Sequence, residues 1–147
     1  MFKLSAYLVA SCILMVVTGC GSSGPQLLPV SGKVSTKDGK PCDNALVVFH
    51  PQESERVNDP KPFAKTDEQG NFKLTTNVEG DGAIAGKYGV TIVWQSAAKE
   101  SKFSLSGEGQ GSSGDRLNGK YANPGQPQIT IEVKAGTNNQ VDLSVEG

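Results

Sequence analysis

The sequence is poor in the side chains that carry most enzyme chemistry. It has one histidine, His50, and three cysteines among 147 residues. A metal-dependent hydrolase needs several imidazole, thiolate or carboxylate ligands around one ion, and no Gly-x-Ser-x-Gly motif of a serine hydrolase is present. We therefore expect a protein that is not an enzyme and has no cofactor, with His50 ending a strand beside Pro51.

The sequence also lacks an excess of positive charge. Fourteen lysine and arginine residues are set against fifteen acidic residues, for a net charge of −1. Nucleic-acid binding requires a basic stripe or patch, so we expect no nucleic-acid partner. Aromatic residues are few, at 6%. Phe49, Tyr88 and Trp94 could form a platform for sugar rings, but at strand spacing such residues are more typical of a core.

The one long apolar run lies at the N-terminus, where Lys3 precedes residues 4–17. A cationic start, a short apolar core and small residues before a cleavage point are typical of a secretory signal. Val17-Thr18-Gly19-Cys20 resembles the bacterial lipobox, which implies cleavage between Gly19 and Cys20 and attachment of lipid, palmitate included, to Cys20. The alternatives are an ordinary secretory signal and an uncleaved anchor.

This interpretation divides the chain into three parts. Residues 1–19 are the expected lipoprotein signal peptide, residues 20–27 the lipidated cysteine and a flexible Gly/Ser tether, and residues 28–147 one folded domain. We expect a protein held in the cell envelope through its lipid. Because Gly21 stands where some bacteria read aspartate as an inner-membrane signal, the outer membrane is favoured. Cys42 is left without a disulfide partner, and we expect it to be buried and inert.

Alternating apolar and polar residues predict about seven short strands. With eighteen glycines and eight prolines and little helical periodicity, this indicates an all-β fold, a single antiparallel β-sandwich of transthyretin-like or Ig-like type. The predicted strands are 30–35, 45–49, 63–66, 72–76, 88–94, 129–133 and 141–145. Residues 45–49 are apolar on both faces, as in a strand covered on each side.

Glycine-containing turns separate several of these strands. Asp38-Gly39 and residues 67–71 are each predicted to form a hairpin, and residues 135–139 are predicted to form a turn. In contrast, the Gly/Ser-rich segment of about residues 95–128 has few side chains that could pack. We expect it to be mostly disordered rather than a binding loop.

The turn after residue 66 could also be read as a calcium loop. Asp67, Glu68 and Asn71 offer the oxygen ligands that hard cations prefer. Their spacing does not match an EF-hand, and a plain turn uses the same residues. We prefer the turn and keep these three as weak metal candidates.

Several segments together resemble the carboxypeptidase regulatory-like domain, a transthyretin-like β-sandwich. Residues 66–76 are similar to its Thr-Asp-x-x-Gly-x-Phe-x-Leu hairpin, and residues 86–92 to the strand that follows. Residues 32–34, 38–41 and 45–51 match further stretches, and residues 120–124 resemble a bacterial lipoprotein subset. The resemblance covers about residues 28–146. It implies a support, spacing or interaction module that carries no zinc site.

We thus expect a lipid-anchored cell-envelope protein with a non-enzymatic structural or protein-interaction role. Its expected partners are the membrane and an envelope protein or glycan. The alternative is a glycan- or peptide-binding module that uses an exposed sheet edge or the long segment. A hydrolase is the remote alternative.

Overall fold

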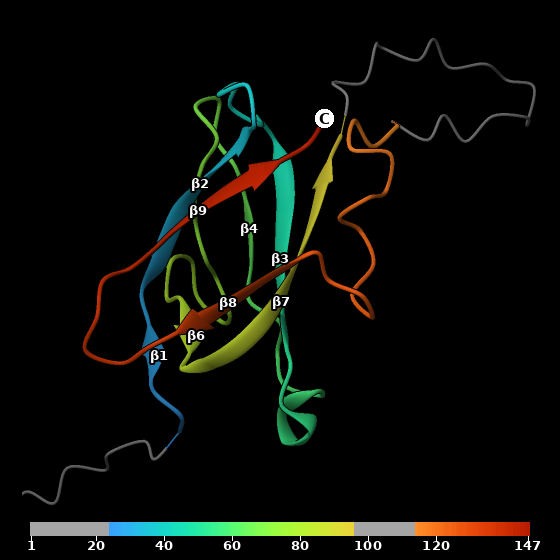
Figure 1. The fold of residues 1–147 in the computed structure, drawn as a ribbon. Helices are drawn as coiled ribbons and strands as arrows, with labels where there is room; N and C mark the ends of the chain where they lie inside the picture. Colours follow the sequence, from blue (N-terminus) through green and yellow to red (C-terminus); the bar gives the residue numbers. More distant parts are fainter. Residues whose placement is uncertain (1–23, 96–113) are drawn as a thin grey trace, which may run out of the picture.

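The computed structural model describes residues 24–95 and 114–147, and these form a β-sandwich (Figure 1). The predicted signal peptide, the Gly19–Cys20 cleavage point and residues 96–113 of the Gly/Ser-rich segment lie outside the described residues. Within the described residues, no helix is long and apolar enough to cross a membrane.

Nine strands and one short 3₁₀ helix, η1 (Ser54–Arg56), make up the described regular structure. All seven predicted strands are present, and two pairs of residues too short to be recognised in the sequence add β1 and β6. The strands are β1 (Leu27–Leu28), β2 (Val30–Thr36), β3 (Ala45–Pro51), β4 (Phe63–Lys65), β5 (Asn71–Lys73), β6 (Ala83–Ile84), β7 (Gly86–Trp94), β8 (Ile129–Val133) and β9 (Asn139–Val145).

The strands form a four-stranded sheet, β4-β3-β7-β8, a three-stranded sheet, β5-β2-β9, and the pair β1-β6. The all-β sandwich is thus confirmed, with one departure from an antiparallel fold. Strands β2 and β9 run parallel, from Val30 opposite Asn139 to Thr36 opposite Val145. The three-stranded sheet is therefore mixed, and its parallel ladder joins the beginning of the domain to its end (Figure 1).

The core lies between the sheets and is built from alternate strand residues. The fully enclosed side chains include Val34, Val47, Phe49, Tyr88 and Ile92. Inward-facing valines and aromatics at every second position give each strand one apolar face, which is the period that a pleated strand imposes. The Phe49 ring packs against the Phe72 and Tyr88 rings, with centroids 6.5 and 5.8 Å away. Cys42 is buried in this core, as predicted.

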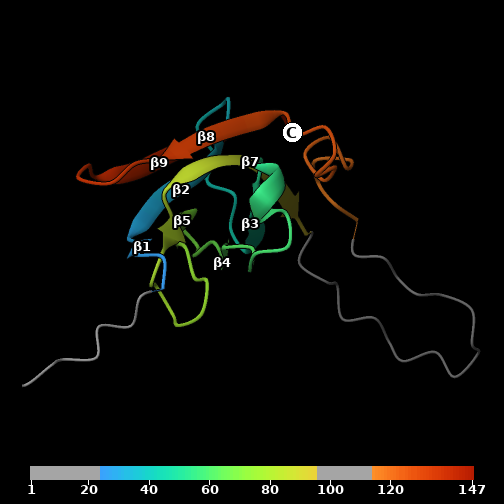
Figure 2. The same cartoon turned by 90° about the horizontal axis from the view of Figure 1, so that it is seen from below.

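The two predicted hairpins and the predicted turn are all present as turns, and each hairpin is flanked by a single antiparallel bridge, Ser35 with Pro41 and Phe63 with Thr75. The Asp38-Gly39 turn leads from β2 to β3, residues 67–71 lead from β4 to β5, and residues 135–138 lead from β8 to β9. In each case the two strands belong to different sheets. The turns therefore carry the chain across the sandwich, seen from its lower end in Figure 2.

One expectation for residues 45–51 needs correction. Leu46 is 40% exposed, so one face of β3 is open to solvent and the strand is not covered on both sides. The strand ends at Pro51, as predicted, and its last two residues, His50 and Pro51, are still paired with Gly89 and Tyr88 of β7. Proline is tolerated because its missing N–H affects one position at the end of the ladder.

The described part of the Gly/Ser-rich segment is folded, contrary to the expected disorder. Leu117 and Tyr121 are buried, and Ile92 of β7 donates its N–H to the carbonyl of Tyr121 at 3.0 Å. The composition of residues 114–128 did not predict their order. Two large apolar side chains hold in place a segment that otherwise consists of turns.

Candidate functional site

The Asp67 turn uses its carboxylate to hold its own backbone. One oxygen, Oδ1, accepts hydrogen bonds from the N–H groups of Gln69 and Asn71 at 2.9 and 2.8 Å, and Oδ2 accepts one from Asn71 Nδ2 at 3.0 Å. The bond from Asn71 is the main reason that the pKa of Asp67 is lowered. Glu68 is exposed. This is the geometry of an Asx-type turn, in which a side chain takes the place of a backbone acceptor.

His50 lies on the outward face of the four-stranded sheet, half-buried. Its Nε2 is 2.9 Å from Thr91 Oγ1 on the neighbouring strand β7. Burial and, secondarily, the charge of Lys61 lower its pKa, so the ring is neutral at pH 7. Glu53, three residues later, accepts from the N–H of Lys87 at 2.8 Å. In the part of the chain that the structure describes, no three histidine, cysteine or acidic residues gather to hold a metal ion.

The three aromatic candidates do not form a sugar platform. Phe49 and Tyr88 are fully enclosed and Trp94 is 4% exposed. The Trp94 indole donates Nε1–H to the carbonyl of Asp43 at 2.9 Å, and the Arg116 guanidinium lies 3.5 Å from the indole centroid. These residues belong to the core and its rim, in agreement with the preferred interpretation of their spacing.

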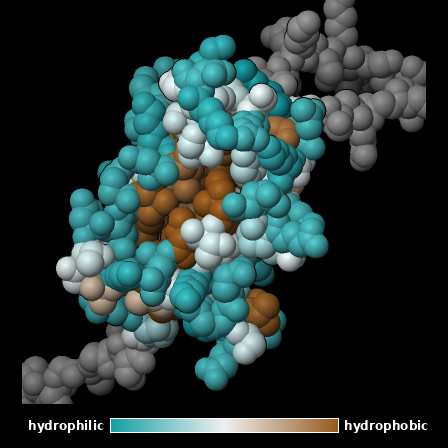
Figure 3. Space-filling view, viewed as in Figure 1, coloured by the Kyte–Doolittle hydropathy of each residue, from teal (hydrophilic) through white to brown (hydrophobic). Residues whose placement is uncertain are grey.

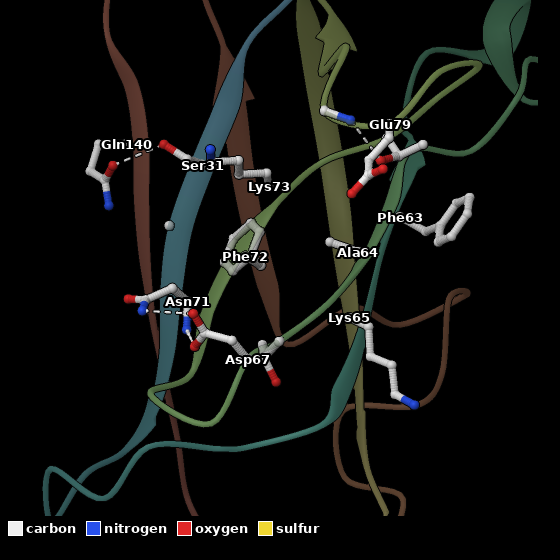
Figure 4. Close-up of a pocket in the computed structure, with 14 residues that line it drawn as sticks. Ser31, Phe63, Ala64, Lys65, Asp67, Asn71, Phe72, Lys73, Glu79 and Gln140 are labelled. Carbon is white, nitrogen blue, oxygen red and sulfur yellow. Dashed lines mark hydrogen bonds between the residues drawn. The ribbon is translucent and has the colours of Figure 1, made fainter.

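A groove of about 910 Å³ lies beside β4 and β5 (Figure 4). Ala64 and Phe72 contribute apolar surface, and Lys65 and Lys73 project along its margins. The two strands are joined above and below this point, by Phe63 with Thr75 and by Asp67 with Asn71. The groove is therefore a shallow depression across a closed side of the sandwich.

A second hollow of about 450 Å³ is lined by Trp94, Arg116, Lys37, Lys40 and Glu146, among others. Lys37 and Lys120 both form ion pairs with Glu146. These pairs lower the pKa of Glu146 to about 2, with the bond from Lys120 the larger cause. The carboxylate of Glu146 is thus already paired, by Lys37 at the hollow and by Lys120 beside it.

Two aspartates that the sequence analysis did not single out fasten the loops. Asp81 accepts from the N–H groups of Thr76, Asn77 and Val78 at 2.6 to 2.9 Å. Asp115 accepts from those of Trp94, Leu117 and Gly119 at 2.9 to 3.0 Å. Both aspartates lie next to glycine-rich turn residues. The backbone N–H groups of such turns need acceptors, so this sequence context could have identified both.

An arginine cluster fastens η1 to the start of β7. Arg56 donates to the hydroxyl of Tyr88 and to the carbonyl of Ala85, at 2.6 and 2.9 Å. Its guanidinium also pairs with Glu53 and Asp59. Gly86 is needed at this point, because its φ is 149° and a Cβ would lie 2.3 Å from Arg56 Nη1. The cluster is a structural fastening, since each of its polar groups faces another.

Comparisons with known proteins add no family to this description. No family model matches the chain, and no curated protein matches it. A 9R-lipoxygenase from Cyanothece PCC8801 is similar in structure at a TM-score of 0.35 and 16% identity. The match covers 81% of this chain and 16% of the lipoxygenase. A similarity at this TM-score supports no conclusion about function.

Proposed function

We propose that this chain is a lipid-anchored cell-envelope protein that acts by contact with another envelope protein, without catalysis. The anchor is proposed from Val17-Thr18-Gly19-Cys20, whose cysteine would carry the lipid. Two or more acyl chains hold a protein at a bilayer firmly, since each buried methylene contributes about 0.8 kcal/mol. The resemblance of residues 66–76 to the carboxypeptidase regulatory-like hairpin supports a module of this kind.

The observation that carries the proposal is how the polar groups of the domain are used. Asp67, Asp81 and Asp115 each bind N–H groups of their own loops, and Arg56 fastens η1 to β7. His50 bonds to Thr91. Polar side chains that hold the loops in place make the domain rigid, and a rigid surface favours recognition of a partner.

Metabolic labelling with a palmitate analogue tests the anchor. We expect the mature protein to be labelled and membrane-bound, and the Cys20→Ala variant to lose both properties. Cys42→Ala is the matched control, because it removes a cysteine that cannot be reached in the fold. An unlabelled mature protein, or a Cys20→Ala variant equally bound to membranes, contradicts the anchor.

Cross-linking in intact envelopes tests the second half of the proposal. We expect a defined envelope protein to be cross-linked to the lipidated protein. This cross-link should disappear when the lipid is absent. Turnover of a small substrate that His50→Ala abolishes would contradict the non-enzymatic role.

A further inference from the structure

The two long sides of the sandwich are closed differently. On one side, Phe63 and Thr75 exchange two hydrogen bonds of 2.9 and 2.8 Å, which tie the start of β4 to the chain after β5. On the other side, β8 and β9 are consecutive in the chain but share no ladder pair, since each belongs to a different sheet. The sandwich is therefore open between β8 and β9.

The core is incompletely covered at this opening. The inward side chains of β2, β3, β4, β5 and most of β7 are buried, whereas Ile129 and Ile131 of β8 and Val141 of β9 are half-buried against the core. Figure 3 shows hydrophobic side chains gathered in a hollow between these two strands. Contiguous apolar surface rimmed by polar residues marks an interaction site.

Among the strands that the structure describes, none pairs with β8 on the side of the opening. The N–H of Gln52 donates to the carbonyl of Lys87, so the backbone N–H and C=O groups of Lys87 and of every second residue after it point toward β3. The backbone groups of Tyr88 and Val90 point the other way, toward β8. Tyr88 lies opposite Ile131 and Val90 opposite Ile129. The intervening residues of β8 therefore direct their N–H and C=O groups away from the sheet.

The same reasoning applies to β9. The N–H of Lys37 donates to the carbonyl of Val145, so Val145 directs its backbone groups toward β2. At every second position before it in the parallel ladder, Leu143, Val141 and Asn139 do the same. The N–H and C=O groups of the alternate residues, Gln140, Asp142 and Ser144, point to the free edge. Within residues 24–95 and 114–147, two strand edges without a pairing neighbour thus border one apolar hollow, which is the combination that an added strand satisfies.

The two strands that border the opening have two acidic side chains and no basic one, and the neighbouring strands place Lys87 opposite Glu132 and Lys33 opposite Asp142. Among the outward side chains of β8 and β9, the two that are charged are Glu132 and Asp142. Glu132 pairs with Lys134 at 3.0 Å, just after β8, and Asp142 accepts a bond from Gln140 at 3.3 Å. A basic side chain on a strand in the opening would find Asp142 exposed.

We propose that the opening between β8 and β9 binds an extended segment of another protein, with apolar side chains at alternate positions and basic side chains between them. This partner class rests on the proposed interaction role and makes it specific. Backbone groups of the segment pair with the free edges, its apolar side chains cover Ile129, Ile131 and Val141, and its basic side chains face Asp142. A second copy of this chain fits less well, since joining the same edges would bring like charges together.

A synthetic peptide in which valine alternates with lysine is the probe. We expect it to bind the full chain, and we expect a peptide of equal composition with its valines in one block to bind far more weakly. In the bound state, hydrogen exchange measured by NMR should slow at least about tenfold at the amides of Thr130, Glu132, Gln140 and Asp142, because those amides gain acceptors.

A charge reversal outside the core tests the pairing with Asp142. Asp142→Lys should weaken binding of the lysine peptide about threefold to fivefold, the range of an exposed ion pair. It should strengthen binding of a peptide with glutamate in place of lysine. Asp38→Lys is the matched control, an exposed acid at a turn away from the opening, and should change neither affinity.

Three results would overturn the assignment. One is unchanged amide exchange at β8 and β9, or slowing confined to Lys65 and Lys73 in the β4–β5 groove. Another is a dimer in sedimentation that Asp142→Lys dissociates, and the third is retention on a glycan array at this edge with no peptide bound. If the partner cross-linked in envelopes contacts another face, this assignment fails while the proposed function stands. If the palmitate label is absent and no partner is captured, the proposed function fails.

Discussion

The hydroxyl of Tyr88 stands between two groups on different elements, accepting from Arg56 Nη2 at 2.6 Å and donating to the carbonyl of Ile84 at 2.8 Å. The Tyr88 ring is enclosed in the core. One side chain therefore fills the core and holds the loop that contains η1.

Tyr88→Phe keeps the ring and removes both hydrogen bonds. Hydrogen bonds to charged groups contribute about 1.5–3 kcal/mol, so we expect a loss of this size in the free energy of unfolding, measured by urea denaturation. Arg56→Met alone should cost a similar amount, and the double variant much less than the sum of the two. Additive losses would mean that the two residues act independently.

Gly32 allows β2, β5 and β9 to approach one another. A Cβ at this position would lie 1.8 Å from the carbonyl oxygen of Val141 and 2.8 Å from the Phe72 ring. Overpacking of this kind costs about 1–3 kcal/mol or more, so Gly32→Ala should lower the melting temperature markedly. Gly24→Ala, which meets nothing within 4 Å, should leave it unchanged, and equal effects of the two would refute this account.

Acid should destabilise the domain through its depressed carboxyl pKa values. The ordinary pKa of Glu146 is 4.5, and in the fold Lys120 and Lys37 lower it to about 2. A folded pKa below the unfolded one adds stability above pH 4.5, and this stability is lost as the pH falls toward 2. Asp67, lowered chiefly by Asn71, and Asp81, lowered by backbone N–H groups despite burial, act in the same direction.

The measurement is urea denaturation of the wild type and of Glu146→Gln between pH 7 and pH 2, at low salt. The variant should be less stable than the wild type at pH 7, and the two curves should approach each other below pH 4.5 and meet near pH 2, where Glu146 of the folded protein becomes protonated. Glu68→Gln, an exposed residue of the Asp67 turn, serves as control and should follow the wild-type curve. A constant gap between Glu146→Gln and wild type at every pH would contradict the assignment.

We expect Asp115 to hold residues 114–128 against the four-stranded sheet. Asp115→Ala frees three N–H groups, among them that of Trp94, and we expect a cost of about 1–3 kcal/mol. Trp94 is the single tryptophan, so its fluorescence reports this site directly. Emission should shift to longer wavelength as the Arg116 cover loosens, and Glu79→Ala, at an exposed position, should leave the spectrum unchanged.

The sequence patterns located the seven main strands but not their partners. Asp38-Gly39 forms a turn for local reasons, since Gly39 adopts a φ of 81°, and a turn signal says nothing about which sheet the next strand joins. The parallel pairing of β2 with β9 depends on the whole core. β1 and β6, with two residues each, are too short to show a period.

The packed residues 114–128 were missed for a related reason. Their composition is that of a disordered segment, and Leu117 and Tyr121 are the buried exceptions. A single carboxylate, that of Asp115, organises the first turns through three hydrogen bonds. Averages over many residues cannot detect one side chain that satisfies several backbone groups at once.

The parallel ladder between β2 and β9 also affects the timing of folding. Its contacts, such as Ser31 with Gln140, join residues 109 positions apart. A ribosome must synthesise almost the whole domain before β2 finds this neighbour, and such distant contacts form slowly. The three-stranded sheet therefore cannot be completed until late in synthesis, and under the export proposed above the chain would meet the export machinery before this sheet has formed.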